Sequence, residues 1–238
     1  MSDIDVHKKL PRIFVDAPIE EGVEIALSAL QSHYFHNVMR KKNGALIRIF
    51  NGRDGEWCAA IAELSKKSGL LLPRQQIKPQ GVTQKDITLI FAPIKKNRLD
   101  FLVEKAVELG VSQFQPILTQ NTEVRKLNAE RIAAQIIEAT EQCERLNLPK
   151  LLPLCDLNKA LKAHSTIYGA IERDENAPHI QNMAPADKCA LLIGPEGGFT
   201  AQEIDIMHSS PALSPVSLGP RILRAETAAL YGLAYLNR

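Results

Sequence analysis

The stretch Leu191–Glu203, which reads LLIGPEGGFTAQE, begins with a short apolar run, continues through a sharp glycine-rich turn and ends in what looks like the start of a helix. Thr200 and Glu203 have the spacing of a capping box, in which each side chain binds the backbone N–H of the other residue. We therefore expect a strand, a tight turn and a helix that begins after Thr200.

The glycine spacing in this turn disfavours a phosphate ligand. Gly194, Gly197 and Gly198 give the pattern GxxGG, whereas a P-loop requires GxxxxGK[ST] and a dinucleotide fingerprint requires GxGxxG. Both of those loops gather backbone N–H groups around an anion, which Glu196 at the tip of the turn would oppose. The capping box would also occupy the first N–H groups of the helix. We expect a ligand that is neutral or cationic.

The same order of strand and helix recurs along the chain from Ile87 onward, where the run ITLIFAP is typical of a buried strand. Strands that alternate with helices imply an α/β fold with a parallel sheet covered on both faces, and ligands of such sheets bind at the carboxyl ends of the strands. The expected strands are 87–93, 114–118, 166–172, 189–194 and 216–218, and the expected helices begin at about 97, 128, 200 and 225, with a further short helix before 166.

The beginning of the chain has a different pattern, with short strands predicted at 12–15 and 23–27 and a hairpin around the turn NGRDG at 51–55. Ser28 is a plausible N-cap for one helix, which Asn43–Gly44 would end. That helix would carry Tyr34, Phe35, Val38 and Met39 on one side. We expect a small β-barrel over residues 1–75, a linker over 76–86 within the stretch PRQQIKPQGVTQKD, and the α/β domain over 87–238.

Composition limits the class of protein further. The chain has 238 residues, of which 45% are hydrophobic, and neither a signal peptide nor a membrane span is apparent, so we expect a cytoplasmic protein. His33 and His36 lie three residues apart, but no third metal ligand is apparent nearby, and we expect no metal. The cysteines are widely scattered, which argues against a zinc site and a disulfide framework; they are Cys58, Cys143, Cys155 and Cys189.

The net charge of +2 gives only weak support for nucleic-acid binding, but the charges are unevenly distributed. Two groups of basic residues, one in each expected domain, either form ordinary solvated surface or hold one polyanion, and the sequence leaves both readings open. The residues are Arg40, Lys41, Lys42, Arg48, Arg53, Lys95, Lys96 and Arg98.

A second turn, within SLGPRILRAETAAL (Ser217–Leu230), also follows a strand and precedes a helix, and two such turns at one sheet edge predict a pocket. Both segments resemble the signature segments of the RsmE family, the ribosomal RNA uracil-N3 methyltransferases of the SPOUT, or trefoil-knot, superfamily. KKNRLDFLVEKAVELGV (95–111) and EATEQCERLNLP (138–149) are similar to internal motifs of that family. SHYFHNVMRKKNGALIRIFNG (32–52) resembles its N-terminal PUA-like domain.

The resemblance implies a homodimer whose C-terminal third is knotted and whose cofactor is S-adenosylmethionine. The sulfonium of this cofactor is a cation, which agrees with an acidic turn. One position departs from the family pattern: Ala225 stands where threonine is usual, which removes a possible N-cap hydroxyl. The residues implied in cofactor binding come from three loops and are Glu172, Ile193, Gly194, Pro195, Glu196, Gly197, Gly198, Leu218, Gly219, Ile222, Leu223 and Arg224.

The implied reaction is methylation of a uridine N3 in 16S ribosomal RNA. N3 carries a proton and lies on the Watson–Crick edge, so the base must be unpaired and the proton must leave. Arg221 or Arg224 would steady negative charge on the uracil oxygens. Glu196 and Glu226 are candidates for the proton acceptor by location alone. Other readings are a methyltransferase acting on a ribose 2′-hydroxyl or another RNA, and a non-catalytic RNA-binding assembly factor.

Overall fold

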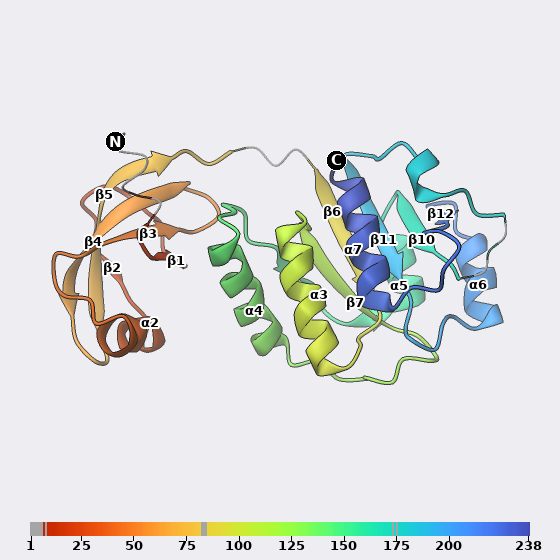
Figure 1. Cartoon of the computed structure of the whole chain (residues 1–238), viewed down its shortest axis with the longest axis horizontal. Coiled ribbons are helices and arrows are strands. Elements are labelled where there is room, and N and C mark those ends of the chain that lie inside the picture. Colours follow the sequence, from red (N-terminus) through yellow and green to blue (C-terminus); the bar gives the residue numbers. More distant parts are fainter. Residues whose placement is uncertain (1–6, 8, 82–84, 173, 175) are drawn as a thin grey trace. The chain divides into compact units, whose positions relative to one another are not determined.

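The computed structural model describes residues 7, 9–81, 85–172, 174 and 176–238, and the chain divides into two compact units. The first unit comprises Met1–Val82 together with Thr140–Leu148, and the second comprises Thr83–Ala139 and Pro149–Arg238 (Figure 1). Part of the expected linker, residues 82–84, lies outside the described residues. The start of the stretch PRQQIKPQGVTQKD is not a linker, because strand β5 continues as far as Lys78.

The first unit is built on a curled, mixed sheet of five strands in the described chain, in the order β1-β3-β4-β5-β2. β1 pairs with β3 in parallel and the remaining pairs are antiparallel, so the predicted hairpin of β3 and β4 is confirmed. Register shifts along β4 and β5 act as bulges, which bend strands and so favour a half-barrel. The strands are β1 (Arg12–Phe14), β2 (Ile25–Ala26), β3 (Leu46–Phe50), β4 (Glu56–Leu64) and β5 (Gly69–Lys78).

The helix of this unit begins as predicted but ends early. Ser28 caps α2 (Ala29–His33) in a capping box with Gln31, and the chain then continues as a π-helix, η1 (Tyr34–Val38). The backbone of Arg40 takes the left-handed conformation with φ of 49°, so the helix stops before Asn43–Gly44, the end that the sequence predicts.

The apolar side chains of this helix do not all face the core. Phe35 is fully buried, whereas Tyr34 and Val38 are 47% and 63% exposed. Leu30, four residues before Tyr34, is 85% exposed. Because residues four apart lie on the same side of a helical segment, Leu30, Tyr34 and Val38 form an exposed apolar stripe.

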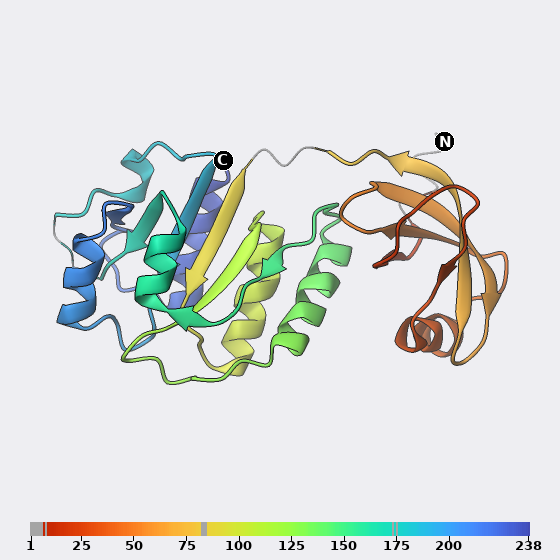
Figure 2. The same ribbon diagram turned by 180° about the vertical axis from the view of Figure 1, so that it is seen from behind.

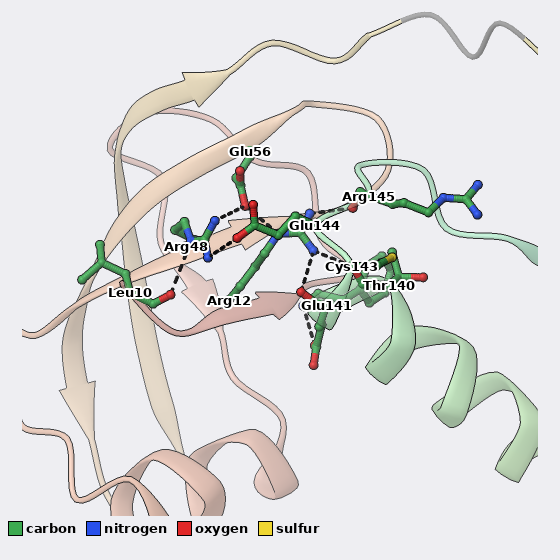
Figure 3. Close-up of polar contacts among 10 residues, drawn as sticks. Leu10, Arg12, Arg48, Glu56, Thr140, Glu141, Cys143, Glu144 and Arg145 are labelled. Carbon is green, nitrogen blue, oxygen red and sulfur yellow. Dashed lines mark hydrogen bonds and ion pairs between the residues drawn. The ribbon is translucent and has the colours of Figure 1, made fainter. Parts of the chain in front are cut away.

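A buried arginine attaches Thr140–Leu148 to this sheet (Figure 3). Arg12 on β1 is 8% exposed, and its Nε donates to Glu56 Oε1 at 2.6 Å. Its other nitrogens donate to the carbonyl oxygens of Thr140 at 2.9 Å and Arg145 at 2.6 Å. Thr140 belongs to the last turn of α4 (Ala129–Gln142), so the guanidinium satisfies a helix-end carbonyl. Its positive charge also interacts favourably with the negative end of the helix dipole.

Arg48 extends this cluster. Its nitrogens lie 3.6 Å from Glu56 Oε1 and 2.8 Å from Glu144 Oε1. Burial lowers the pKa of the Arg12 guanidinium, although Glu56 opposes this effect. The hydrogen bond from Arg48 holds the pKa of Glu144 below its usual value. The cluster explains why α4 ends at Gln142 rather than near Pro149, since the residues after the helix are held by these arginines.

Replacing Glu56 by glutamine leaves two buried guanidinium groups without their shared anion. We expect Glu56→Gln to lower the free energy of unfolding by about 3 kcal/mol, because breaking a buried ion pair costs more than the pair itself contributes. Trp57, the single tryptophan, lies in the same strand, so its fluorescence during urea unfolding measures this unit. Glu63→Gln, at an exposed position of β4, is the matched control, and equal midpoints for the two variants would contradict the role of the cluster.

The second unit contains the expected parallel sheet, which is confirmed. Its seven strands, as far as the structure describes the chain, follow the order β12-β10-β11-β6-β7-β8, with β9 paired to β7. Every pair is parallel. The strands are β6 (Asp86–Phe91), β7 (Gln113–Leu118), β8 (Lys150–Leu151), β9 (Cys155–Asp156), β10 (Ile167–Ala170), β11 (Lys188–Ile193) and β12 (Leu213–Val216).

Helices cover both faces of this sheet (Figures 1 and 2). α3 (Lys96–Glu108) and α7 (Ala225–Leu236) pack together on one face, while α5 (Leu157–Ala163) lies on the other and contacts α6 (Ala201–His208). None of the helices in the described part of the chain is long and apolar enough to cross a membrane. Leu233 and Leu236 of α7 are fully buried within this unit.

The start of α7 corrects one expectation. Arg224 occupies the N-cap position, and Ala225 is the first helical residue. The side chain at 225 therefore does not stand at the N-cap, and the alanine found there does not remove a capping hydroxyl. Strand β12 also lies earlier in the chain than expected, because it ends at Val216 and does not include Leu218.

Candidate active site

Strand register brings three loops to one edge of the parallel sheet. Ala170 at the end of β10 lies opposite Ile193 of β11 and opposite Val216 of β12. The chain leaves all three strands at the same level, so the two glycine-containing turns share an edge, as the sequence predicts. The loops that follow contain Glu172, Gly194–Gly198 and Leu218–Arg224 respectively.

The glycine turn after β11 is tightly packed. A Cβ at Gly194 would lie 2.7 Å from the ring of Phe199, so a larger residue does not fit there without movement. Gly198 has φ of 68°, a conformation that glycine adopts readily. The side-chain amide of Asn121 donates to the carbonyl oxygens of Gly197 at 3.1 Å and Gly198 at 3.0 Å. Asn121 therefore holds the turn from a neighbouring loop.

Sequence reasoning missed Asn121, although a signal was present. It lies three residues after β7, at the carboxyl edge of the same sheet. The neighbouring Gln120 uses its backbone N–H, which donates to Glu203 Oε1 at 2.8 Å. The other oxygen of Glu203 accepts from the backbone of Thr200 at 2.9 Å, and the predicted capping box is confirmed.

The acid at the tip of the turn is paired. Arg98, in the first turn of α3, donates to Glu196 and places its Nε 3.9 Å from Glu226 Oε1. Arg98 thus compensates the charge that we expected to repel a phosphate group. Glu196 is therefore weaker evidence for a cationic ligand than the sequence alone suggests.

Residues 178–180 support the start of the third loop through backbone hydrogen bonds. Ser217 exchanges backbone hydrogen bonds with the 178–180 segment: its N–H donates to Pro178 O and its carbonyl accepts from Ile180, both at 2.9 Å. Gly219 has φ of 112°, which again suits glycine. Arg221 and Arg224 are exposed at the end of this loop.

The residues proposed for RNA binding have different environments. Arg40, Lys42 and Arg53 are exposed in the first unit, and Lys41 is half-buried. Arg48 is 7% exposed and belongs to the buried cluster, so it is not part of an accessible surface. In the second unit, the exposed Lys95 and Lys96 precede the half-buried Arg98, which faces the glycine turn.

Comparison with known protein families defines the class. Residues 82–237 match a model described as an RNA methyltransferase domain, and residues 30–73 match a model described as an RNA methyltransferase PUA domain. The chain is thus an RNA methyltransferase by family, with the parallel sheet in one matched region and strands β3, β4 and the start of β5 in the other.

Individual relatives narrow the assignment. The chain is 33% identical to the ribosomal RNA small subunit methyltransferase E of Rickettsia conorii, over 96% of both chains. It superposes with TM-score 0.84 on the enzyme of that name from Neisseria gonorrhoeae bound to S-adenosylmethionine, at 28% identity over 94% of this chain and 95% of the other. A Legionella pneumophila protein with the same bound cofactor gives TM-score 0.86, at 28% identity over 96% and 97%. The protein belongs to the RsmE family of small-subunit ribosomal RNA methyltransferases.

Removing the Asn121 amide should loosen the glycine turn. We expect Asn121→Ala to weaken S-adenosylmethionine binding about five- to tenfold, because each lost hydrogen bond contributes roughly 0.5–1.5 kcal/mol. Titration calorimetry measures this change. Gln120→Ala is the control, since the bond of Gln120 to Glu203 uses its backbone. Unchanged affinity in Asn121→Ala would show that the turn keeps its shape without this support.

Proposed function

We propose that the protein transfers the methyl group of S-adenosylmethionine to N3 of a uridine in small-subunit ribosomal RNA. The observation that carries this proposal is the shared level of Ala170, Ile193 and Val216, which gathers three loops at one sheet edge. Support comes from relatives named ribosomal RNA small subunit methyltransferase E and from the cofactor in two similar structures.

The three loops would hold the cofactor chiefly through their backbone. Glycine at 194, 198 and 219 allows close approach or left-handed backbone at each turn, and these are positions where side chains contribute little. The proposed set is unchanged from the sequence: Glu172, Ile193, Gly194, Pro195, Glu196, Gly197, Gly198, Leu218, Gly219, Ile222, Leu223 and Arg224. Glu196 contributes as the partner of Arg98, which ties the glycine turn to α3.

The reaction depends more on how the protein positions the nucleophile and the cofactor than on covalent catalysis by a side chain. The cofactor supplies an activated methyl group on a sulfonium, and the nucleophile must approach in line at roughly 3–3.5 Å. Arg221 and Arg224, exposed beside the third loop, are suited to donate hydrogen bonds to the uracil oxygens as negative charge develops. Their exposure favours contact with a large substrate rather than with the core.

Two finer features of the architecture are also proposals. A trefoil knot in the C-terminal third agrees with the strand order β12-β10-β11 and with the backbone bonds between Ser217 and the 178–180 segment. A homodimer agrees with the 47% exposed Phe101 on α3, the helix that packs beside α7. Light scattering in solution tests the dimer.

The RNA surface that we propose in the first unit combines charge with apolar groups. No acidic residue occurs between Glu24 and Asp54, whereas Arg40, Lys42 and Arg53 are exposed within that interval. The exposed apolar stripe of α2 and η1 precedes Arg40 directly, and its Tyr34 can stack on an unpaired base. Lys41 completes this group, while Lys95 and Lys96 form a separate basic group in the second unit.

Deleting the gene should remove 3-methyluridine from small-subunit ribosomal RNA, as measured by mass spectrometry of nucleosides. The purified protein with S-adenosylmethionine should restore the nucleoside to RNA or subunits from the deletion strain. Loss of a 2′-O-methylated nucleoside instead, or of a modified nucleoside from another RNA, would indicate the rival methyltransferase. No heat of cofactor binding together with no methyl transfer would support the assembly-factor reading.

Reversing charge on the first unit should weaken RNA binding in a salt-dependent way. For Arg40→Glu with Lys42→Glu, we expect the slope of log affinity against log salt to fall by about 1.4, at roughly 0.7 for each single-strand phosphate contact. Tyr34→Ala should lower affinity with little change in slope, because stacking releases no counterions. The control reverses Lys66 and Lys67, exposed at the turn before β5. Equal affinities and slopes in all variants would rule out this surface.

A further inference from the structure

Glu226 carries an oxygen without a partner. It is the second residue of α7 and is 8% exposed, and its Oε2 is fully covered with no hydrogen-bond donor among the described residues. A buried carboxylate oxygen in this state is costly, and such groups in native proteins are normally satisfied. Because the oxygen is covered, a ligand can donate to it only after the atoms that cover it move, and we take the missing donor to be one that arrives in this way with a ligand.

Glu226 lies near Arg98 at the start of α7. Arg98 Nε lies 3.9 Å from the other oxygen, Oε1, while another nitrogen of the same guanidinium donates to Glu196. α7 begins directly after the Leu218–Arg224 loop, so Glu226 stands at the edge where the three loops meet.

The other described carboxylates of this edge are occupied. Glu196 is paired with Arg98, and both oxygens of Glu203 accept backbone N–H groups. Asp174 lies 3.5 Å from His208, and Glu172 also has a partner of its own. Within the part of these loops that the structure describes, Glu226 alone offers a covered acceptor oxygen without a donor.

We propose that Glu226 Oε2 accepts the N3 proton of the target uracil, an inference that rests on the proposed function. The N3–H bond breaks and its proton passes to Oε2. The electron pair left on nitrogen forms the bond to the methyl carbon, and the carbon–sulfur bond breaks with its pair remaining on sulfur, which becomes a neutral thioether. Glu226 then releases the proton to solvent. Arg98 is a positioning residue, since its Nε lies 3.9 Å from the opposite oxygen.

Glu226→Gln keeps the shape of the side chain and removes its basicity. We expect kcat to fall about 10²- to 10⁴-fold, the usual contribution of a general base. Calorimetry should show S-adenosylmethionine affinity within about threefold of the unaltered protein, the range expected when the cofactor contacts are kept. Glu130→Gln, at an exposed carboxylate in the first turn of α4, is the matched control and should leave kcat unchanged.

The decisive readout uses RNA with 5-fluorouridine at the target position, because the fluorine makes N3 more acidic. The deficit of Glu226→Gln should shrink at least about tenfold with this RNA, and its kcat should rise more steeply with pH than that of the unaltered protein, since a more acidic nucleophile needs less help from a base. Unaltered kcat, or an equal deficit on both RNAs with parallel pH profiles, overturns the proposal.

Two further results are informative. If Glu226→Gln no longer binds the cofactor, Glu226→Asp, which keeps a carboxylate, is compared on the same two RNAs, and an equal deficit on both again overturns the role. Failure of the proposed function is distinguishable, because the unaltered protein would then form no 3-methyluridine at all.

Discussion

The parallel pairing of β10 with β11 on one side and β12 on the other is the constraint on which the site depends. Because Ala170, Ile193 and Val216 are aligned, three loops from distant parts of the sequence leave the sheet together. The interiors of β10 and β11, which maintain much of this alignment, are almost entirely apolar and buried. The stability of the sheet therefore determines the geometry of the site, and the loops themselves can consist largely of turns.

One cation at this edge lies close to two acids. Arg98 contacts Glu196 on the glycine turn and lies near Glu226 on α7, so a single guanidinium from α3 links that turn to the first turn of α7. Asn121 adds a neutral link from a fourth loop. Among the described residues of this edge, Glu196, Glu203 and Asp174 have partners, whereas Oε2 of Glu226 is covered without one.

The sequence predicts contacts between residues that are close in the chain, but not contacts between residues that are far apart in it. The capping box at Thr200 involves residues three apart, and the order of strands and helices follows from apolar periodicity. Arg98 meets Glu196 across 98 residues and Asn121 meets Gly197 across 76, so no local pattern could predict either contact. For the same reason Arg48 looked like part of a basic surface although it is buried. The π-helical turn of η1 likewise has no signature in a 3.6-residue period.

The cluster around Arg12 has a consequence for how the chain is made. Its partners in Thr140–Leu148 leave the ribosome long after β1 to β5 have been synthesised. Until then, Arg12 and Arg48 of the nascent N-terminal sheet have Glu56 as a partner. The carbonyl groups and the carboxylate of Glu144 that complete the cluster have not yet been synthesised. Translation of about 60 residues after Val82 must precede the final closure of this unit, so its folding is coupled to the emergence of the catalytic half.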